Sequence, residues 1–439
     1  MPIYLTSTEA ATRLGVSRQT LYAYVSRGLL RAESDPASRE SRYLAAEVER
    51  LAAERARGRN PKEVARAALD WGAPVLESGI TLIEDGRLSY RGVDALDLAK
   101  QASLEDIAAL LWQCDKNSAF VSHAPQAPDI FNTLLDHYRG QHAEQALLPL
   151  FAVASEDAPT AIGQRNAASE MQGCGDLVRL LAACLLRTAP DTAPIHEQCA
   201  RAWGVGEAGA ELIRMALVLC ADHELNASSF TARCIASTDA SLRSVVIGGL
   251  AGLSGGRHGA TTARGEALWD ELGDIDPETR LHARLARGDD LPGFGHPLYP
   301  DGDVRAACLL ARVLPDHPQW KTLMDLGSTL IGAQPSLDLA LVAVRRHLGL
   351  PVGAAFGLFA LGRSVGWIAH ALEQRENPHL IRPRAVYTGS RPAASDKQSN
   401  PANARKPAPK RTRTGTRSGK TEADTQPGPD MFTTLFKII

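Results

Sequence analysis

Apolar residues recur at every third or fourth position along most of the chain between residues 62 and 389. Segments such as DIAALLWQC, DLVRLLAACLLR, GAELIRMALVLCADH and LDLALVAVRRHLG show this spacing, which is typical of helices that bury one face. Alternating strand patterns are almost absent, and the convincing hairpin signal is ITLIEDGRLSYRG, in which Asp85-Gly86 separates two short apolar stretches. The pattern therefore predicts a large, mainly α domain.

A second, smaller unit is predicted over residues 1–58. Thr6-Ser7-Thr8-Glu9 fits a capping box at the start of a helix, and Gly15-Val16-Ser17 separates that helix from a second one. Two short helices around a tight glycine turn indicate a helix-turn-helix. Residues 31–43 are polar and turn-rich enough to form a wing, and residues 45–57 predict a closing helix.

The regions that flank the large domain have little to bury. Asn60-Pro61 marks a boundary, so residues 59–75 are predicted to be a linker. Pro, Ser, Thr, Lys and Arg dominate the chain after residue 389, and residues 390–439 are predicted to be a disordered basic tail. The last segment, MFTTLFKII, is apolar, and its pattern leaves both docking on the body and a frayed end open.

Composition narrows the function classes. The 439 residues allow two or three domains, and 44% apolar with 22% charged residues is typical of a soluble globular protein. The formal net charge of −2 gives no global attraction to nucleic acid, so a basic surface for such a partner must be local.

The start of the sequence lacks a secretory leader and no apolar run reaches about 18 residues, which predicts a cytoplasmic protein without membrane contact. The cysteines form no CxxC pair, which argues against a disulfide framework and a zinc site.

Three polar residues occur at positions that the packing of a helical core does not explain. His258 follows Gly255-Gly256 directly before a predicted helix, and a neutral imidazole at a helix N-terminus is suited to donate a hydrogen bond to a carbonyl oxygen. His296 lies in the loop GFGHP, and Asp338 interrupts an apolar face at the start of another helix. Taken singly, each has an ordinary interpretation: a loop histidine, or an aspartate that caps a helix.

Taken in chain order, these stretches resemble the motifs of citrate synthases. The similar segments are YRGVDALDLA, ADHELNASSFTAR, SGGRHGA, GFGHPLY, PSLD, GRSVGWIAH and IRPRAVYTG. The resemblance covers about residues 76–389 and implies that family's two-domain helical fold, with a small domain at about residues 265–365 that closes over the large one and excludes water. It also implies an acyltransferase that joins acetyl-CoA to oxaloacetate and hydrolyses the thioester to citrate and CoA. No cofactor is implied beyond the CoA thioester, which is a substrate.

The resemblance assigns roles that match what the reaction needs. A carboxylate is too weak a base to deprotonate the methyl group of a thioester unless an electrophile stabilises the enol oxygen at the same time. By the match, Asp338 is the base and His258 is the neutral donor to the thioester oxygen. His296 is the donor to the keto oxygen of oxaloacetate, on which alkoxide charge develops.

The resemblance also assigns oxaloacetate contacts. It places Arg305, Arg363 and Arg382 on the two carboxylates, for which the planar guanidinium is suited, and His223 as a further carboxylate or keto contact. A surface ion pair is the ordinary fate of an arginine, but it is a weak explanation for Arg363 in its apolar surroundings. In the family an arginine at the position of Arg382 reaches the neighbouring subunit's site, so this assignment implies a homodimer.

Several positions depart from the family pattern. His258-Gly259-Ala260-Thr261 replaces the usual His-Gly-Gly-Ala, Ser336-Leu337-Asp338 replaces Asn-Val-Asp, and Asp303-Val304-Arg305 replaces Asp-Pro-Arg. Pro300 stands where a basic residue often lies near the CoA phosphates. No catalytic side chain is lost. The alternative of a 2-methylcitrate synthase that uses propionyl-CoA stays open, because one methylene changes discrimination by only about 1 to 3 kcal/mol.

The segment STEAATRLGVSRQTLYAYVSRGLL resembles the helix-turn-helix of MerR-type and excisionase-type DNA-binding proteins. Such a second helix enters the major groove, with base-edge and phosphate contacts expected from Arg18, Gln19, Thr20, Tyr22 and Arg27. Acidic residues leave this unit little basic excess, so a docking or dimerisation module is an alternative. A transcription regulator that senses oxaloacetate or acyl-CoA is a further alternative for the whole chain, although a sensor has no use for a methyl-proton base.

Overall fold

The computed structural model describes residues 4–26, 30–34, 41–44, 48, 51, 76–158, 167–273, 276–377 and 379–390. Several predicted features lie outside these residues: the linker at 59–75, Arg27, most of the helix at 45–57, and the tail beyond residue 390.

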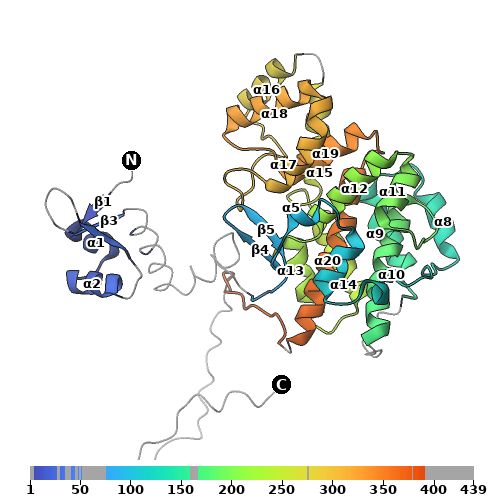
Figure 1. The fold of residues 1–439 in the computed structure, drawn as a ribbon, viewed down its shortest axis with the longest axis horizontal. Helices are drawn as coiled ribbons and strands as arrows, with labels where there is room; N and C mark the ends of the chain where they lie inside the picture. The colour runs from blue at the N-terminus through green and yellow to red at the C-terminus, as the bar shows by residue number, and fades with distance from the viewer. Residues whose placement is uncertain are drawn as a thin grey trace, which may run out of the picture. The chain divides into compact units, whose positions relative to one another are not determined.

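The amino-terminal unit contains two helices and a small sheet (Figure 1). Its elements are β1 (Tyr4–Thr6), α1 (Ser7–Leu14), α2 (Arg18–Ser26), β2 (Ala32–Ser34) and β3 (Ser41–Leu44). The strands are antiparallel in the order β1-β3-β2. The predicted wing is therefore confirmed as the β2–β3 pair, whereas its third strand, β1, was not predicted because three residues carry too little pattern.

The turn chemistry of this unit matches its sequence. Thr6 caps α1: the Glu9 N–H donates to Thr6 Oγ1 at 3.3 Å and the Thr6 N–H donates to Glu9 Oε2 at 2.8 Å, which is the predicted capping box. Gly15 ends α1 in the left-handed conformation with φ 61°, where a Cβ is disfavoured. The unit has an apolar core of its own, formed by Ala10, Ala11, Leu14, Leu21, Leu30, Tyr43, Val48 and Leu51.

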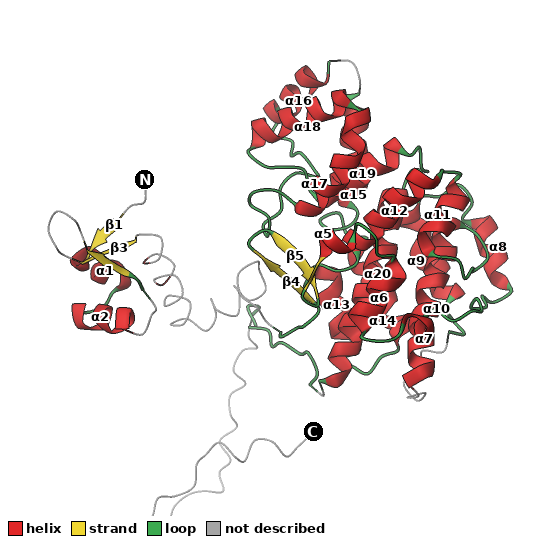
Figure 2. Ribbon diagram, in the orientation of Figure 1, coloured by secondary structure: helices red, strands yellow, loops and turns green. Residues whose placement is uncertain are grey.

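From residue 76 onward the described chain is mainly helical (Figure 2), which confirms the expectation from apolar spacing. The elements are β4 (Thr81–Glu84), β5 (Arg87–Tyr90), β6 (Val93–Asp94), α5 (Ala95–Leu98), α6 (Leu104–Trp112), α7 (Lys116–Ala119), α8 (Ile130–His137), α9 (Ala143–Ala154), α10 (Ala167–Leu186), α11 (Ile195–Trp203), α12 (Glu207–Cys220), α13 (Ala227–Ala236), α14 (Leu242–Leu253), α15 (Thr261–Leu272), α16 (Pro277–Ala286), α17 (Val304–Val313), η1 (Leu314–Asp316), α18 (Pro318–Ile331), α19 (Leu337–His347) and α20 (Ala354–Glu376). Residues 383–390 contain no helix or strand.

The predicted hairpin is confirmed as β4 and β5. They pair antiparallel with Glu84 opposite Arg87, and the two turn residues between them, Asp85 and Gly86, have positive φ values of 50° and 71°. A two-residue turn with both φ values positive suits the twist of the flanking strands. The third strand, β6, is two residues long and had no signal of its own.

Helix α20 runs through the centre of the main core and packs against α6, α12, α13 and α14 (Figure 2). It is long and apolar enough to span a membrane by length and composition, but 94% of its most apolar window is buried inside the protein, as in the core helix of a soluble protein. Two glycines one turn apart allow the close packing. A Cβ on Gly362 would lie 2.7 Å from Leu217 O, and one on Gly366 would overlap Ala221 O.

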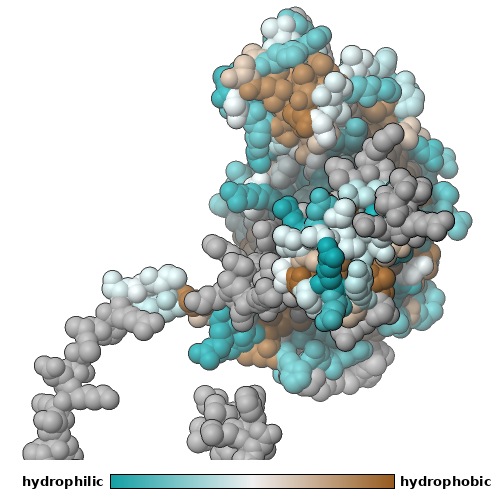
Figure 3. Space-filling model, turned by 90° about the vertical axis from the view of Figure 1, so that its left-hand side faces the viewer, coloured by the Kyte–Doolittle hydropathy of each residue, from teal (hydrophilic) through white to brown (hydrophobic). Residues whose placement is uncertain are grey.

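Helices α15, α16 and α18 enclose a separate apolar cluster in the upper part of Figure 1. The cluster consists of Leu268, Leu272, Leu281 and Leu291, and the space-filling view shows apolar residues reaching the surface of the same part of the protein (Figure 3). Helices α19 and α20 contribute instead to the main core.

Candidate active site

His258 lies on the short connection between α14 and α15. Its Nε2 is 2.8 Å from Ser228 Oγ, and its ring stands edge-on to Phe359 with 5.9 Å between the centroids. Burial, followed by the positive charge of Arg363, lowers the pKa of His258 to about 3. The imidazole is therefore neutral at physiological pH, as the sequence predicted.

Ser228, on the first turn of α13, links His258 to the central helix. Trp367 Nε1–H donates to Ser228 Oγ at 3.1 Å, and Asn226 Oδ1 lies 2.8 Å from the same hydroxyl. The Ser228 hydroxyl donates to Asn226 Oδ1, and since a hydroxyl has one proton, His258 then donates to Ser228 Oγ from Nε2. Rotation of the hydroxyl toward His258 Nε2 instead leaves the ring proton on Nδ1, as a hydrogen-bond donor for a ligand.

His223 and His296 come from different loops and meet with Tyr299. The two imidazoles are edge to face at 4.9 Å between centroids, and His223 Nε2 is 3.1 Å from Tyr299 Oη. The Leu298 N–H donates to His296 Nδ1 at 3.2 Å, so the proton of the neutral ring is on Nε2. Burial and the charge of Arg305 lower the pKa of His296 to about 4 and that of His223 well below its ordinary value.

Arg305 and Asp303 form a buried, bidentate ion pair at the start of α17. Arg305 Nε donates to Asp303 Oδ1 at 2.9 Å and Nη2 donates to Oδ2 at 2.8 Å. Although burial opposes it, Asp303 raises the pKa of Arg305 above its ordinary value. A charge-assisted pair of this geometry is rigid, so the remaining guanidinium surface has a fixed direction.

Asp338 lies on the first turn of α19, close to this pair. Burial, reinforced by Asp303 and opposed by Arg305, raises the pKa of its carboxyl to about 6. Ser336 Oγ donates to Oδ2 at 3.4 Å, but Oδ1 is inaccessible to solvent and has no hydrogen-bond partner among the described residues. An unpartnered carboxylate oxygen is available to accept a proton from a ligand.

Arg363, on α20, is 1% exposed. Its Nε donates to Cys220 O at 2.7 Å, whereas its Nη2 is buried without a hydrogen-bond partner in the described structure. Burial lowers the pKa of the guanidinium, an effect that Asp222 opposes. No described carboxylate lies within ion-pair distance of Arg363, and a buried cation without a pair is costly unless an anionic ligand completes it.

The chain matches the family model for the citrate synthase C-terminal domain over residues 68–384. It belongs to the citrate synthase family. A curated citrate synthase from Haloferax volcanii is 31% identical over 365 residues, which are 73% of this chain and 95% of that protein. A 2-methylcitrate synthase from Mycobacterium tuberculosis is 28% identical, covering 69% of this chain and 84% of the relative. The chain is thus a condensing acyltransferase, while the relatives bear the names of two different acyl specificities.

Solved structures agree with this assignment, and the amino-terminal unit matches a domain model of its own. The crystal structure of citrate synthase from Thermotoga maritima superimposes with a TM-score of 0.63 at 25% identity, covering 74% of this chain and 96% of that chain. A helix-turn-helix domain model matches residues 4–56. The chain therefore combines a citrate synthase fold with a helix-turn-helix unit.

Arg382 does not join the cluster formed by the other predicted site residues. It is exposed and makes no hydrogen bond or ion pair with another described residue. The Ile381 N–H donates to Ser237 Oγ at 3.1 Å, at the end of α13 opposite to Ser228. The length of this ten-residue helix, about 15 Å, therefore separates the segment around Arg382 from the site in its own chain.

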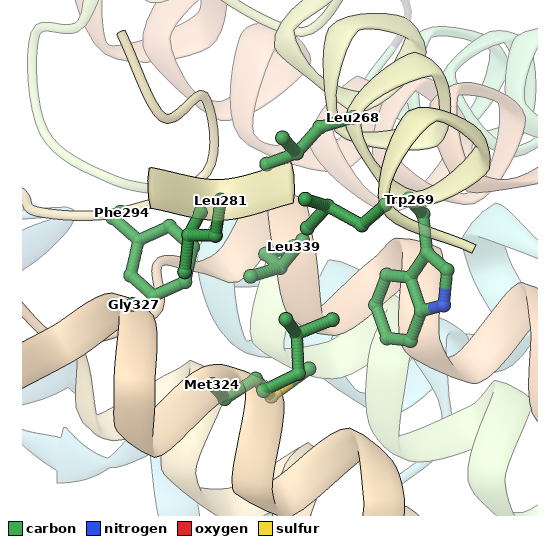
Figure 4. Close-up of a pocket in the computed structure, with 9 residues that line it drawn as sticks. Leu268, Trp269, Leu281, Phe294, Met324, Gly327 and Leu339 are labelled. Carbon is green, nitrogen blue, oxygen red and sulfur yellow. The ribbon is translucent and has the colours of Figure 1, made fainter. Parts of the chain in front are cut away.

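An apolar pocket lies behind two of the candidate catalytic residues (Figure 4). Phe294 and Leu339 point into it; Phe294 is two residues before His296, and Leu339 follows Asp338. The full lining is Leu268, Trp269, Leu272, Leu281, Phe294, Leu323, Met324, Gly327 and Leu339. Gly327 allows the Phe294 ring to approach, because a Cβ there would lie 2.8 Å from Phe294 Cζ.

The candidate DNA-binding residues lie along α2. Arg18, Gln19 and Tyr22 are exposed, Thr20 is half-buried and bonded to Ser17 at 3.0 Å, and Arg27 is outside the described residues. Arg18 donates to Thr8 Oγ1 of α1. One face of α2 is therefore presented to solvent.

Sequence reasoning missed Ser228, Tyr299 and the bridging function of Asp303. Tyr299 is part of the quoted loop GFGHPLY and Ser228 is part of ADHELNASSFTAR, so both were in similar segments without an assigned part. Their partners, His223 and His258, are 76 and 30 residues away. A spacing pattern along one element does not reveal such pairs.

Proposed function

We propose that this member of the citrate synthase family condenses acetyl-CoA with oxaloacetate and releases citrate and CoA. The observation that carries the proposal is the Asp338 carboxyl, whose buried Oδ1 has no described partner, together with two neutral imidazoles on separate loops, both within the electrostatic range of Arg363. A methyl-proton base and two donors for developing oxyanions are what a thioester condensation requires.

The first step is enolisation of the thioester. Asp338 Oδ1 accepts the methyl proton, and burial makes this carboxylate more basic than one in water. His258 donates a hydrogen bond to the thioester oxygen from Nδ1, provided that Ser228 donates to Nε2. A neutral imidazole suits this position because it stabilises the enol oxygen without a prior charge.

The second step joins the enol carbon to the keto carbon of oxaloacetate. His296 Nε2–H donates to the keto oxygen while the alkoxide forms, and His223 contacts the same substrate. Arg305 and Arg363 bind the carboxylates; the unpartnered Nη2 of Arg363 supports this assignment. Water then hydrolyses the citryl thioester, and the route needs no metal ion or prosthetic group.

The proposal includes a homodimer in which Arg382 of each subunit contributes to the active site of the other subunit. Its exposure, and its place at the far end of α13 from Ser228, support a contribution to the second subunit's site rather than to its own. Sedimentation of the purified chain together with oxaloacetate binding by Arg382→Ala tests this point. A monomer with full activity rejects it.

The preferred acyl group is tested by measuring how fast the protein releases the CoA thiol from different acyl-CoA substrates. Purified protein with saturating oxaloacetate should release CoA from acetyl-CoA with a higher kcat/KM than from propionyl-CoA, and should release none when oxaloacetate is omitted. A higher kcat/KM with propionyl-CoA assigns the chain as a 2-methylcitrate synthase. Absence of release from both thioesters rejects catalysis and favours a regulator that senses these ligands.

DNA binding is a second proposed function. Tyr22 is 50% exposed while Leu21, the residue before it, is fully buried, so α2 offers a polar face on a fixed scaffold, as a groove-reading helix does. Selection of bound fragments from genomic DNA by the full-length protein, compared with Arg18→Ala, tests this function. Equal selection by both proteins means that α2 is not the reader.

A further inference from the structure

A buried ionisable pair that the proposed chemistry does not use lies next to the site. Asp222 precedes His223 in the chain, and His370 lies two turns after Arg363 on α20. Asp222 Oδ1 is 3.2 Å from His370 Nε2, and neither side chain is exposed. The residues therefore connect a substrate-facing loop with the helix that carries Arg363.

The sequence of α20 creates this contact. Gly362, Gly366 and His370 are spaced by four residues, which places them on one face of the helix. A Cβ on Gly366 would lie 2.5 Å from Asp222 Oδ1. Since glycine leaves this face without side chains for two turns, Asp222 packs against the helix and faces the next side chain along it, His370.

Among the described residues, the groups that face the pair include side chains on β4 and β5. Thr81 Oγ1, on β4, donates to Asp222 Oδ2 at 2.6 Å, and the Tyr90 hydroxyl, on β5, donates to Asp222 O at 3.4 Å. Glu224, on the same loop as Asp222, lies within the electrostatic range of His370, as Arg363 does of Asp222. Both ring nitrogens of His370 are buried without a well-formed hydrogen bond to a described residue.

The proton on His370 affects the whole site because Asp222 interacts with Arg363. When His370 is protonated, its charge lowers the pKa of Asp222 against the effect of burial, and Asp222 is the main charge that favours protonated Arg363. The buried ionised groups of the site are two arginines and three aspartates: Arg305, Arg363, Asp222, Asp303 and Asp338. With a neutral His370 this set already has an excess of negative charge before a dianion binds.

We propose that binding of the dicarboxylate substrate beside Arg363 is coupled to uptake of a proton by His370, with Asp222 as the counter-charge that connects the two. This inference rests on the proposed function, since it takes oxaloacetate as the dianion. A negative ligand favours the protonated form of a nearby imidazole, and by linkage the protonated imidazole favours the ligand. His370 is thus a positioning residue that sets affinity for oxaloacetate, not a group that touches it.

Proton uptake is measured by titration calorimetry with oxaloacetate in two buffers of different ionisation enthalpy, at several pH values across the range in which imidazoles titrate. Asp338 is a second carboxyl that can take up a proton, so the comparison uses Asp338→Asn as the background. In that background we expect oxaloacetate binding to take up at least about half a proton per site at the pH of greatest uptake. After His370→Gln we expect less than about a tenth of a proton per site. His282→Gln is the control, because His282 is an exposed imidazole on α16.

The steady-state readout separates this coupling from a general structural effect. In the otherwise native protein, KM for oxaloacetate should rise with pH, by up to about tenfold per pH unit for coupling to one proton. His370→Gln keeps a side chain of similar size with an amide donor but cannot take up a proton. This variant should therefore show a KM that is flat over the same range, with the pH profile of kcat unchanged.

Equal proton uptake with and without His370 overturns the inference, and so does an absence of oxaloacetate binding. If thiol release fails but oxaloacetate binds with His370-dependent uptake, condensation is rejected and the coupling stands. If His370→Gln does not fold, as judged by circular dichroism, Asp222→Asn in the same background replaces it. Removal of the counter-charge should abolish the uptake, and uptake that persists counts against the pair.

Discussion

Asp303 Oδ2 accepts a hydrogen bond of 3.1 Å from the N–H of Leu337. The same carboxylate holds Arg305 through both of its oxygens, and Leu337 is the residue before Asp338. Asp303 therefore fixes the direction of Arg305, the proposed oxaloacetate-binding cation, and the start of the helix that carries Asp338, the proposed base. Asp303 and Leu337 are 34 residues apart in the chain.

Asp303→Asn should reduce both stability and catalysis. The change leaves Arg305 as a buried cation with a weakened partner, and breaking a buried ion pair lowers the free energy of unfolding by about 3 to 5 kcal/mol. We expect kcat/KM for oxaloacetate to fall by about 100-fold, because Arg305 and Asp338 both lose their anchor. Chemical denaturation and steady-state kinetics measure the two effects.

The control for this variant is Asp290→Asn. Asp290 is 67% exposed and pairs with Arg264 and, at 4.0 Å, with Arg284; pairs of an exposed carboxylate contribute about 0 to 1 kcal/mol. The control should behave as the native protein does. A loss of similar size in both variants would show that the Asp303 bridge has no special role.

The pH dependence of the rate should reflect the ionisation of the Asp338 carboxyl. The base must be ionised to accept the methyl proton, and its pKa is raised to about 6 by burial. We therefore expect kcat/KM to fall as the pH decreases through about 6, with a slope of one, because kcat/KM reports the ligand-free site, while His258 and His296 stay neutral down to about pH 4. An acid limb near pH 4 instead would mean that another group controls the rate.

Asp338 should also lower the stability of the folded protein at neutral pH. Its folded-state pKa is higher than that of an exposed aspartate, so the folded state favours the protonated carboxyl. The contribution of this one group to stability is greatest below about pH 4 and is lost as the pH rises through about 6. Asp338→Asn should therefore raise the unfolding free energy by about 1 to 3 kcal/mol at pH 7.5. Thermal melts at pH 4 and pH 7.5 test this, since the gain should disappear at the lower pH.

The sequence was informative where a property is local. The capping box at Thr6 and Glu9 and the hairpin turn at Asp85-Gly86 involve neighbours in the chain, and both are present in the structure. Helices followed from the spacing of apolar residues, because one buried face repeats every turn. The short strands β1 and β6 were missed because two or three residues carry too little alternation to be recognised, and each becomes a strand only by pairing with β3 or β5.

The candidate site was predictable only as a set of separate residues. His258 and Asp338 had distinctive local sequences, and their roles stay predictions. Nothing in the local sequence indicates that Trp367 donates to Ser228, 139 residues away. The burial of Arg363 was expected from its apolar flanks, but its lack of an ion-pair partner among the described residues is a tertiary property that only the packed helices reveal.

Ser228→Ala tests whether the hydroxyl sets the tautomer of His258. Without the Ser228 proton, Nε2 of His258 can carry the ring proton and Nδ1 then no longer donates to the thioester oxygen. We expect kcat to fall by about 10- to 100-fold while KM for oxaloacetate is unchanged, since one lost donor at an oxyanion is worth at least this much. Ser229→Ala is the matched control, because the Ser229 hydroxyl contacts Asn226 rather than His258; equal losses in the two variants contradict the role of Ser228.

Gly327→Ala tests whether the apolar pocket supports the His296 loop. The new Cβ would lie 2.8 Å from Phe294 Cζ, so the ring must shift and take the loop that carries His296 with it. Overpacking of this kind lowers the unfolding free energy by about 1 to 3 kcal/mol, and we expect kcat to fall several-fold through the displaced donor. Gly206→Ala, where a Cβ meets no atom within 4 Å, should leave kcat unchanged. If Gly327→Ala melts at a lower temperature but keeps its native kcat, the pocket supports the fold alone, and His296 is held by other contacts.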